Sequence, residues 1–293
     1  MKWLVYGSKG WIGGMVCSYL RNNGETVVEA VSRADDEKMV EDELMNVTPD
    51  RILCLIGRTH GPGYSTIDYL EQKGKLVENV RDNLYSPLVL AILGQRYGIH
   101  ITYLGTGCIF SSTEASFKEE SLPNFFGSGY STVKGFTDRL MHFFDSTVLN
   151  LRIRMPIVGY HCPRNFITKI TSYEKVCSIP NSMTVLEGMI PIMIRLATKQ
   201  TTGTVNLTNP GTISHNEILE LYKTHVDPSF TWKNFTLEEQ SKILLSERSN
   251  NKLDSTRLLE LCPDVPSIRE AVESILKSWD NSPLQMRLEA QIE

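Results

Sequence analysis

A glycine-rich turn near the start of the chain constrains the fold more than any other feature of the sequence. Residues 2–6 are a short apolar run typical of a buried strand, and glycines recur after it at Gly7, Gly10 and Gly13. Apolar residues at helical spacing then follow in 15–20. A strand, a Gly-x-x-Gly-x-x-Gly turn and a helix start predict a dinucleotide cradle, because they offer free N–H groups and a positive dipole end to a pyrophosphate.

Other residues near this turn are predicted to complete the cofactor site. Lys9, Trp11 and Ile12 lie within the turn itself, and the second predicted strand is followed by Ser32 and Arg33. In this fold the end of the second strand reads the adenosine ribose, where a carboxylate favours NAD and a cation accommodates the 2′-phosphate of NADP. Ser32 and Arg33 therefore favour NADPH, with NADH as the alternative.

Strand and helix patterns alternate through the first half of the chain. The predicted strands are 2–6, 26–31, 51–56, 100–104 and 147–153, and the predicted helices between them are 36–46, 76–91 and 130–144. This alternation predicts an α/β fold, a Rossmann-type doubly wound parallel sheet. We expect an NADP-binding domain over 1–155, with a late strand near 203–207 returning to it.

The alternation of strand and helix patterns ends after residue 155, and prolines at positions 163, 180, 191 and 210 divide the chain into short segments. We expect a smaller C-terminal substrate-binding lobe that makes up most of 156–280, followed by a polar tail at 281–293. The stretch 110–124 is predicted to be a polar loop.

Composition excludes several functional classes. The 293 residues carry a net charge of −4, without the basic excess that nucleic-acid binding requires. No apolar run is long enough to span a bilayer, and a strand that starts at Lys2 leaves no room for a leader, so we expect a cytoplasmic protein without membrane contact. Six dispersed cysteines indicate reduced thiols, not disulfides or a metal site.

A Tyr-x-x-x-Lys pair supplies candidate catalytic groups. Tyr130 and Lys134 would share one face of a predicted helix, where the ammonium would lower the phenol pKa and suit it to protonating a carbonyl oxygen. Thr106 supplies a hydroxyl at the end of a strand. Asn83, on a predicted helix before it, is expected to bind the cofactor together with Tyr130 and Lys134, and the Lys134 ammonium would contact the nicotinamide ribose. The loop after the third strand contains Gly57 and Arg58, which we expect to contact the cofactor. His60 in the same loop either contacts the sugar or the nicotinamide, or has only a structural role.

This order of parts resembles the extended short-chain dehydrogenase/reductase superfamily, and Cys108 adds a thiol beside the expected ketone site. A ketone acidifies its alpha hydrogens, so a thiol at this place suggests epimerisation, which needs a base on one face and an acid on the other. The partner would be Lys169, or with less support His161. The alternative for Cys108 is a small buried side chain without chemistry.

Longer strings sharpen the resemblance. They closely resemble the bifunctional UDP-4-keto-6-deoxy-glucose 3,5-epimerase/4-reductases, also called nucleotide-rhamnose synthase/epimerase-reductases, which are related to dTDP-4-dehydrorhamnose reductase. The strings are GWIGG (10–14), TGCIF (106–110), FKEE (117–120), PRNFITKI (163–170), IPNSMTVL (179–186), SHNEIL (214–219), NFTLEEQ (234–240) and RSNN (248–251).

The resemblance implies roles for individual residues. Cys108 and Lys169 fall on positions implicated in epimerisation, and Thr106, Tyr130 and Lys134 fall on the reductase triad. The implied reaction converts UDP-4-keto-6-deoxy-D-glucose, supplied by a separate 4,6-dehydratase, into UDP-L-rhamnose with NADPH. A homodimer through helices near 84–96 and 130–144 is also expected.

Residues of the second half are expected to bind the substrate. Arg248 suits the diphosphate because its planar fork can bind two oxygens. The other candidates are polar or lie in a polar turn, namely His60, Asn165, Asn181, Met183 and Thr184. Two alternative functions stay open: a reductase that acts only on an already epimerised dTDP sugar, and a non-catalytic regulatory subunit of the same fold.

Overall fold

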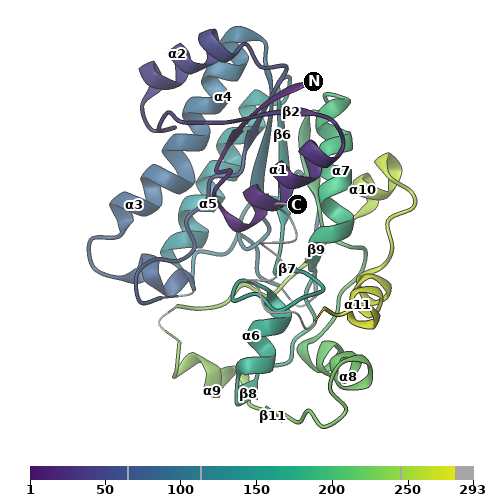
Figure 1. Ribbon diagram of the computed structural model, residues 1–293. Coiled ribbons are helices and arrows are strands. Elements are labelled where there is room, and N and C mark those ends of the chain that lie inside the picture. The colour runs from purple at the N-terminus through teal and green to yellow at the C-terminus, as the bar shows by residue number, and fades with distance from the viewer. Residues whose placement is uncertain (65, 113, 245, 281–293) are drawn as a thin grey trace.

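A parallel sheet of six strands forms the centre of the molecule (Figure 1). The computed structural model describes residues 1–64, 66–112, 114–244 and 246–280, so the predicted polar tail at 281–293 lies outside the described residues. The strand order is β10-β6-β4-β3-β1-β2, and all neighbours run parallel. The strands are β1 (Lys2–Tyr6), β2 (Thr26–Glu29), β3 (Arg51–Cys54), β4 (His100–Thr106), β6 (Val148–Ile153) and β10 (Gly203–Asn206).

The topology creates one switch point in the sheet. From β1 the chain moves outward to the edge strand β2 and then crosses back to β3 on the other side of β1. Loops leaving the carboxyl ends of β1 and β3 therefore diverge, and ligands of open α/β sheets bind in the crevice between them. The predicted α/β doubly wound fold is confirmed.

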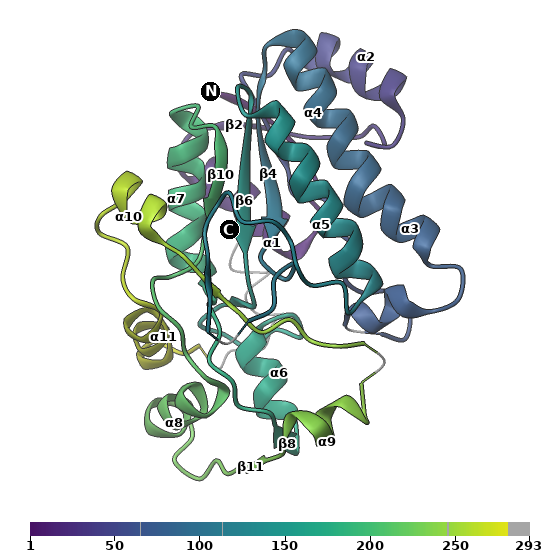
Figure 2. The same ribbon diagram turned by 180° about the vertical axis from the view of Figure 1, so that it is seen from behind.

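Both faces of the sheet are buried, which explains the continuous apolar strands. Trp3 and Val5 point to one face and Leu4 and Tyr6 to the other, as the two-residue period of a strand requires. Helices of the described part of the chain cover both faces (Figures 1 and 2). They are α1 (Trp11–Asn22), α7 (Leu186–Thr198) and α10 (Thr256–Leu261) on the first face, and α2 (Glu37–Val47), α4 (Ser86–Tyr97) and α5 (Gly129–Met141) on the second.

The helix predicted at 76–91 contains an irregular turn. It begins as α3 (Leu76–Val80), passes through one π-helical turn at Arg81–Tyr85, and continues as α4 to Gly98, which has a φ of 63°. Such π turns are frequent at functional sites. Here the turn carries Asn83, one of the predicted cofactor residues.

A second apolar cluster lies below the carboxyl ends of the strands (Figure 2). Its buried side chains include Ile157, Ile170, Met183 and Val272. Its helices are α6 (Phe166–Ser172), α8 (His215–His225) and α11 (Ile268–Lys277), with α9 (Leu237–Ser241) nearby and two-residue strand pairs β7 (Pro156–Ile157) with β9 (Thr184–Val185), and β8 (Lys175–Val176) with β11 (Lys233–Asn234). The domain boundary at residue 155 stays a prediction.

Three local details differ from expectation. Pro191 lies inside α7 instead of breaking the chain, because the buried residues of this helix pack in the sheet's core. The stretch 110–124 is not simply polar: Phe110 and Phe117 stack with ring centroids 4.5 Å apart, and β5 (Ser116–Phe117) pairs with β12 (Lys252–Leu253). Helix α6 carries no clear pattern in the sequence because it has only seven residues. Among the described residues, no helix combines the length and apolarity needed to cross a membrane.

Candidate active site

The glycine turn forms a tight cradle between β1 and α1. Gly7 has a φ of +85°, and a Cβ at Gly13 would lie 2.0 Å from the Gly7 carbonyl oxygen, so neither position has room for a side chain. Gly10 is the N-cap of α1, which has no side-chain cap and no acidic residue in its first turn. The first N–H groups of α1 are therefore left for an anion, and the residues present fit the pyrophosphate of a dinucleotide. Trp11 and Ile12 pack on the sheet's core, and Lys9 is exposed.

The two residues predicted to read the adenosine ribose have different surroundings. The Ser32 hydroxyl hydrogen-bonds the buried Glu43 carboxylate and lies 3.1 Å from the Tyr6 hydroxyl. Arg33 is 64% exposed in its side chain and pairs with Asp35 at 3.0 Å. The exposed Arg33 guanidinium can thus exchange Asp35 for a solvent-side phosphate, whereas the Ser32 hydroxyl is hydrogen-bonded inside the protein.

Asn83 organises the loop after β3. Its side-chain Oδ1 accepts a hydrogen bond from the Arg58 N–H, and its Nδ2 donates to the Arg58 carbonyl, both at 3.0 Å. Its own carbonyl accepts a hydrogen bond of 2.7 Å from Thr137 of α5. Asn83 therefore ties Gly57 and Arg58, predicted cofactor residues, to the helix that carries Tyr130.

Thr106, Tyr130 and Lys134 meet at the carboxyl end of β4. Thr106 ends the strand, and Ser128 caps the start of α5 through a hydrogen bond from the Ser131 N–H. This cap fixes Tyr130 in the first turn, where its phenol exchanges a hydrogen bond with Thr106. All three side chains are buried.

The expected effect of Lys134 on Tyr130 is wrong in one respect. Burial raises the pKa of the Tyr130 phenol, the nearby Cys108 raises it further, and the Thr106 hydrogen bond only partly opposes them. The Lys134 ammonium donates to the Tyr103 hydroxyl, and burial lowers its own pKa to about 8. Tyr130 therefore keeps its proton at neutral pH, which still suits a proton donor.

A cavity of about 750 Å³ opens beside these residues. Cys108 and Tyr130 both line it, and Cys108 packs against the cluster of Tyr69, Leu70 and Tyr130. The backbone N–H of Cys108 donates to the Thr106 hydroxyl at 3.1 Å. The thiol and the phenol thus face the same space, whose volume is that of a small-molecule site. Their joint action on one ketone stays a prediction.

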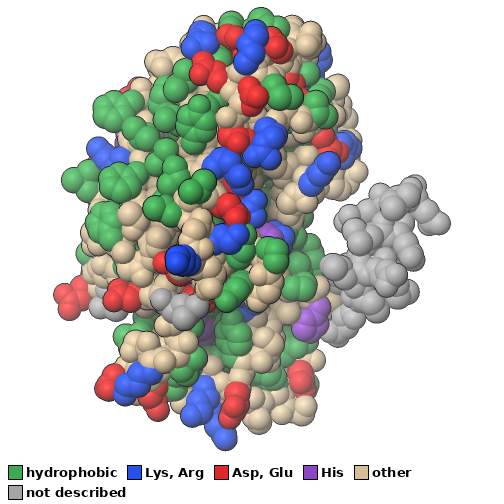
Figure 3. Space-filling view, turned by 90° about the vertical axis from the view of Figure 1, so that its left-hand side faces the viewer, with side chains coloured by type: hydrophobic (Ala, Val, Ile, Leu, Met, Phe, Trp, Pro, Cys, Tyr) green, Lys and Arg blue, Asp and Glu red, His purple; other side chains and the backbone are tan. Residues whose placement is uncertain are grey.

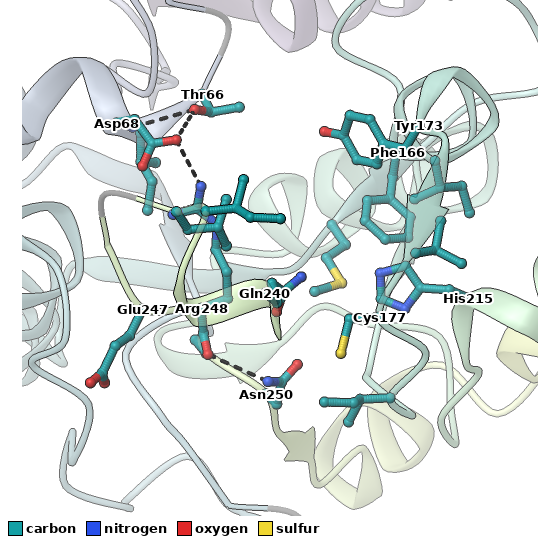
Figure 4. Close-up of a pocket in the computed structure, with 18 of the residues that line it drawn as sticks. Thr66, Asp68, Phe166, Tyr173, Cys177, His215, Gln240, Glu247, Arg248 and Asn250 are labelled. Carbon is teal, nitrogen blue, oxygen red and sulfur yellow. Dashed lines mark hydrogen bonds and ion pairs between the residues drawn. The ribbon is translucent and has the colours of Figure 1, made fainter. Parts of the chain in front are cut away.

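Arg248 lies on the wall of the same cavity (Figure 4). Its Nη2 donates to the Asp68 carboxylate at 2.8 Å, and its Nη1 donates to the Ser246 hydroxyl. Burial by itself raises the pKa of Asp68, but the hydrogen bonds from Arg248 and Thr66 outweigh burial and lower it. Arg248 is therefore a cation held in place by a carboxylate.

Lys169 and His60 belong to a cationic cluster next to the cavity. The His60 Nε2 lies 2.6 Å from Nη2 of Arg164, which joins the loop after β3 to the start of α6. Burial lowers the pKa of Lys169, and the charge of Arg164 lowers it further. Burial and the charges of Arg164, Arg58 and Lys169 lower the pKa of His60 in the same way. Neither Lys169 nor His60 is among the residues that line the cavity.

Four other predicted substrate residues are buried away from the cavity wall. Asn165 caps α6 and hydrogen-bonds the Val158 and Tyr160 carbonyls, and Asn181 accepts a hydrogen bond of 2.9 Å from the buried Arg154. The Thr184 hydroxyl donates to the Leu207 carbonyl. Met183 belongs to the lower apolar cluster. The other alternative, His161, packs its ring edge-on against Trp279 at 5.8 Å.

Several residues that line the cavity were not predicted from the sequence. Asp68, Phe166, Tyr173 and His215 all line it, and His215 directly follows the Ser214 of a Ser-x-x-Glu capping-box pattern at the start of α8. That capping box is present, with Ser214 and Glu217 as its members. A signal for the aromatic pair existed in the spacing of Phe166 and Tyr173, which places them on one face of a helix.

The cradle, the Thr106 hydroxyl and the Tyr130–Lys134 pair on a doubly wound sheet define a short-chain dehydrogenase/reductase. Comparison with known proteins narrows this class, although no protein-family model matches the chain. The crystal structure of a UDP-rhamnose synthase from Acanthamoeba polyphaga mimivirus is 60% identical, covers 94% of this chain and 99% of that one, and superposes with a TM-score of 0.93.

Two proteins of Arabidopsis thaliana are also similar. A bifunctional dTDP-4-dehydrorhamnose 3,5-epimerase/dTDP-4-dehydrorhamnose reductase is 42% identical over 92% of this chain and 90% of its own length. A trifunctional UDP-glucose 4,6-dehydratase/UDP-4-keto-6-deoxy-D-glucose 3,5-epimerase/UDP-4-keto-L-rhamnose-reductase is 39% identical over 93% of this chain but only 41% of its own length. The chain belongs to the family of bifunctional nucleotide-rhamnose 3,5-epimerase/4-reductases.

Proposed function

We propose that this enzyme converts UDP-4-keto-6-deoxy-D-glucose into UDP-L-rhamnose, by epimerisation at C3 and C5 followed by NADPH-dependent reduction at C4. The observation that carries the proposal is the shared cavity, in which Cys108 and Tyr130 face one space. Cys108 follows the carboxyl end of β4, and the glycine cradle follows the carboxyl end of β1 in the same parallel sheet. The exposed Arg33 guanidinium after β2 supports NADPH over NADH.

The epimerisation stage is assigned to Cys108 and Lys169. One of them removes a proton alpha to the ketone, the negative charge moves to the ketone oxygen, and the other returns a proton on the opposite face. Thr106 and the protonated Tyr130 stabilise that oxygen by hydrogen bonds. The lowered pKa of Lys169 supports its use as a base near neutral pH, because a larger share of it is uncharged. The assignment of each group to C3 or C5 stays open.

The reduction stage uses the same oxygen. NADPH bound in the cradle supplies the hydride. Tyr130 donates its proton to the C4 oxygen, and Lys134, one turn along α5, places a positive charge behind the phenol as that proton leaves. The charge that develops on Tyr130 is thus balanced inside the buried site.

The substrate requires an enzyme that supplies it. A 4-keto-6-deoxy sugar arises by 4,6-dehydration, and we propose a separate 4,6-dehydratase as the source, since the trifunctional plant relative carries that activity in its name. All six cysteines are unpaired, which supports a reducing, cytoplasmic setting.

A second copy of the chain is the proposed partner. Exposed hydrophobic side chains follow the outer surfaces of α3, α4 and α5 and gather on one side of the molecule (upper left of Figure 3). They are Leu76, Val77, Val80, Tyr85, Ile92, Phe136 and Phe143. Phe136→Glu should convert a dimer into a monomer in light scattering, whereas Leu237→Glu on α9 should not; a wild-type monomer contradicts the proposal.

The test of the function is the identity of the product. The protein is incubated with NADPH and UDP-4-keto-6-deoxy-D-glucose as the sole sugar nucleotide, without a partner epimerase. UDP-L-rhamnose is the expected product. A 6-deoxy sugar of unchanged C3 and C5 configuration would leave only a reductase, and no NADPH oxidation with any 4-keto sugar would leave a non-catalytic protein of this fold.

A further inference from the structure

The end of the cavity formed by α6 and α8 has a different chemistry from the catalytic end. Phe166, Ile170 and Tyr173 line it and lie four and three residues apart, so one face of α6 and its C-cap forms this wall. Figure 4 shows Phe166 and Tyr173 across the cavity from Arg248. An apolar wall with flat rings suits a planar, stacking ligand better than a sugar or a phosphate.

His215 supplies the polar group at this wall. It is the first residue of α8, and its ring meets Phe166 edge-on with centroids 5.2 Å apart. The ring hydrogen-bonds the backbone of Ile179, and burial lowers its pKa to about 4, so it is neutral at physiological pH. A neutral imidazole that donates its N–H to a carbonyl keeps a lone pair on its other nitrogen. Figure 4 shows a ring nitrogen turned toward the cavity.

The order of groups along the cavity matches the parts of a sugar nucleotide. At the catalytic end, Cys108 and Tyr130 pack against Tyr69. The Arg248 cation pairs with Asp68, the residue before Tyr69 in the chain, and Figure 4 shows the rings of Phe166, Tyr173 and His215 on the opposite side of the cavity from Arg248. This step rests on the proposed function, which places the sugar at Cys108 and Tyr130. The diphosphate then falls at Arg248 and the base at the rings.

We propose that Phe166, Tyr173 and His215 form the nucleobase slot, and that His215 reads the N3–H of a uracil-type base through its acceptor nitrogen. Uracil and thymine both present a donor at N3, whereas cytosine presents an acceptor there. The slot therefore selects an imide base, and His215 determines that selection.

The test compares UDP with 3-methyluridine diphosphate, in which a methyl group replaces the N3 hydrogen. Calorimetric titration of the wild-type protein should show about tenfold weaker binding of the methylated ligand, as expected for one lost hydrogen bond with an acceptor left unpaired. In His215→Leu this difference should disappear. The matched control is His225→Leu on the same helix, outside the cavity and facing Glu273 at 3.6 Å, which should keep the wild-type difference.

A second variant tests the slot independently, in case His215→Leu does not fold. Phe166→Leu removes a stacking ring but keeps the acceptor, so it should weaken UDP and its methylated analogue equally. Equal binding of the two ligands by the wild type, or an unchanged difference in His215→Leu, overturns the slot. Binding needs no keto sugar and no NADPH, so failure of the slot is separate from failure to form UDP-L-rhamnose.

Discussion

Arg248 and Asp68 form an ion pair of 2.8 Å on the wall of the cavity, although 180 residues separate them in the chain. The pair joins the loop after β3 to the C-terminal part of the chain, beside the space where a diphosphate is proposed to bind. Asp68 thus partly neutralises the Arg248 charge before a ligand binds, and an incoming diphosphate competes with Asp68 for the guanidinium.

This competition predicts opposite effects for the two residues. Arg248→Leu should weaken UDP binding by about tenfold or more, because a charge-assisted hydrogen bond to phosphate is lost. Asp68→Asn should tighten binding a few-fold, because it frees the guanidinium and removes a negative charge near the phosphates. Titration with UDP measures both. If Asp68→Asn weakens binding as much as Arg248→Leu, Asp68 serves to orient Arg248 and does not compete with the ligand.

The cradle can be tested by two adjacent glycines. A Cβ at Gly13 would lie 2.0 Å from the Gly7 carbonyl, whereas one at Gly14 would meet the Ser8 carbonyl at 3.8 Å, an ordinary contact. Gly13→Ala should therefore abolish NADPH binding, and Gly14→Ala should leave it nearly unchanged. Nucleotide fluorescence reports binding, and UDP titration with circular dichroism shows whether each variant is folded. Normal NADPH affinity in a folded Gly13→Ala protein would contradict the cradle.

The phenol of Tyr130 is predicted to be essential for reduction. Tyr130→Phe should lower the rate of NADPH oxidation by about two to four orders of magnitude, the usual contribution of a positioned acid. Tyr103→Phe removes the partner of Lys134 but leaves the proton donor, so its effect should be much smaller. Stopped-flow absorbance at the NADPH band measures both variants. Unimpaired turnover in Tyr130→Phe would remove this residue from the reaction.

The pH dependence of epimerisation reports on Lys169. A base acts only when uncharged, so the rate of solvent exchange at C3 and C5 should rise as pH increases through the lowered pKa of Lys169. Arg164→Leu removes a cation that lowers this pKa, and the rise should move to higher pH. Arg269→Leu, an exposed arginine on α11 paired with Glu217, should leave the profile in place. A profile that does not move in Arg164→Leu would exclude Lys169 as the titrating base.

The sequence predicted features that depend on short spacing. The cradle lies within 7–13, and Tyr130 and Lys134 are one helical turn apart, so their geometry follows from local structure. Residues such as Asp68 and His215 reach the cavity only through tertiary packing, which no local pattern reveals. The chemistry of Lys169 and Arg248 makes them candidates, and the family resemblance strengthens both.

The polar residues of 181–184 show the opposite case, in which residues predicted to bind the substrate have a structural role. They look like binding groups in the sequence, yet Asn181 serves the fully buried Arg154, whose guanidinium needs hydrogen-bond acceptors inside the protein. Thr184 also accepts a hydrogen bond from the Arg154 backbone N–H at 3.1 Å. The same residue types serve in binding sites and in buried structural networks. Here only the three-dimensional position of Arg154 shows that Asn181 and Thr184 are structural.

The central claim is that the Cys108 thiol and the Tyr130 phenol act on one ketone, and deuterium uptake from deuterated water tests it most directly. Wild-type protein with NADPH should give UDP-L-rhamnose labelled at C3 and C5, as seen by mass spectrometry and NMR. Cys108→Ala should bind NADPH normally and lose label at both carbons. Undiminished deuterium at C3 and C5 in Cys108→Ala would contradict the account.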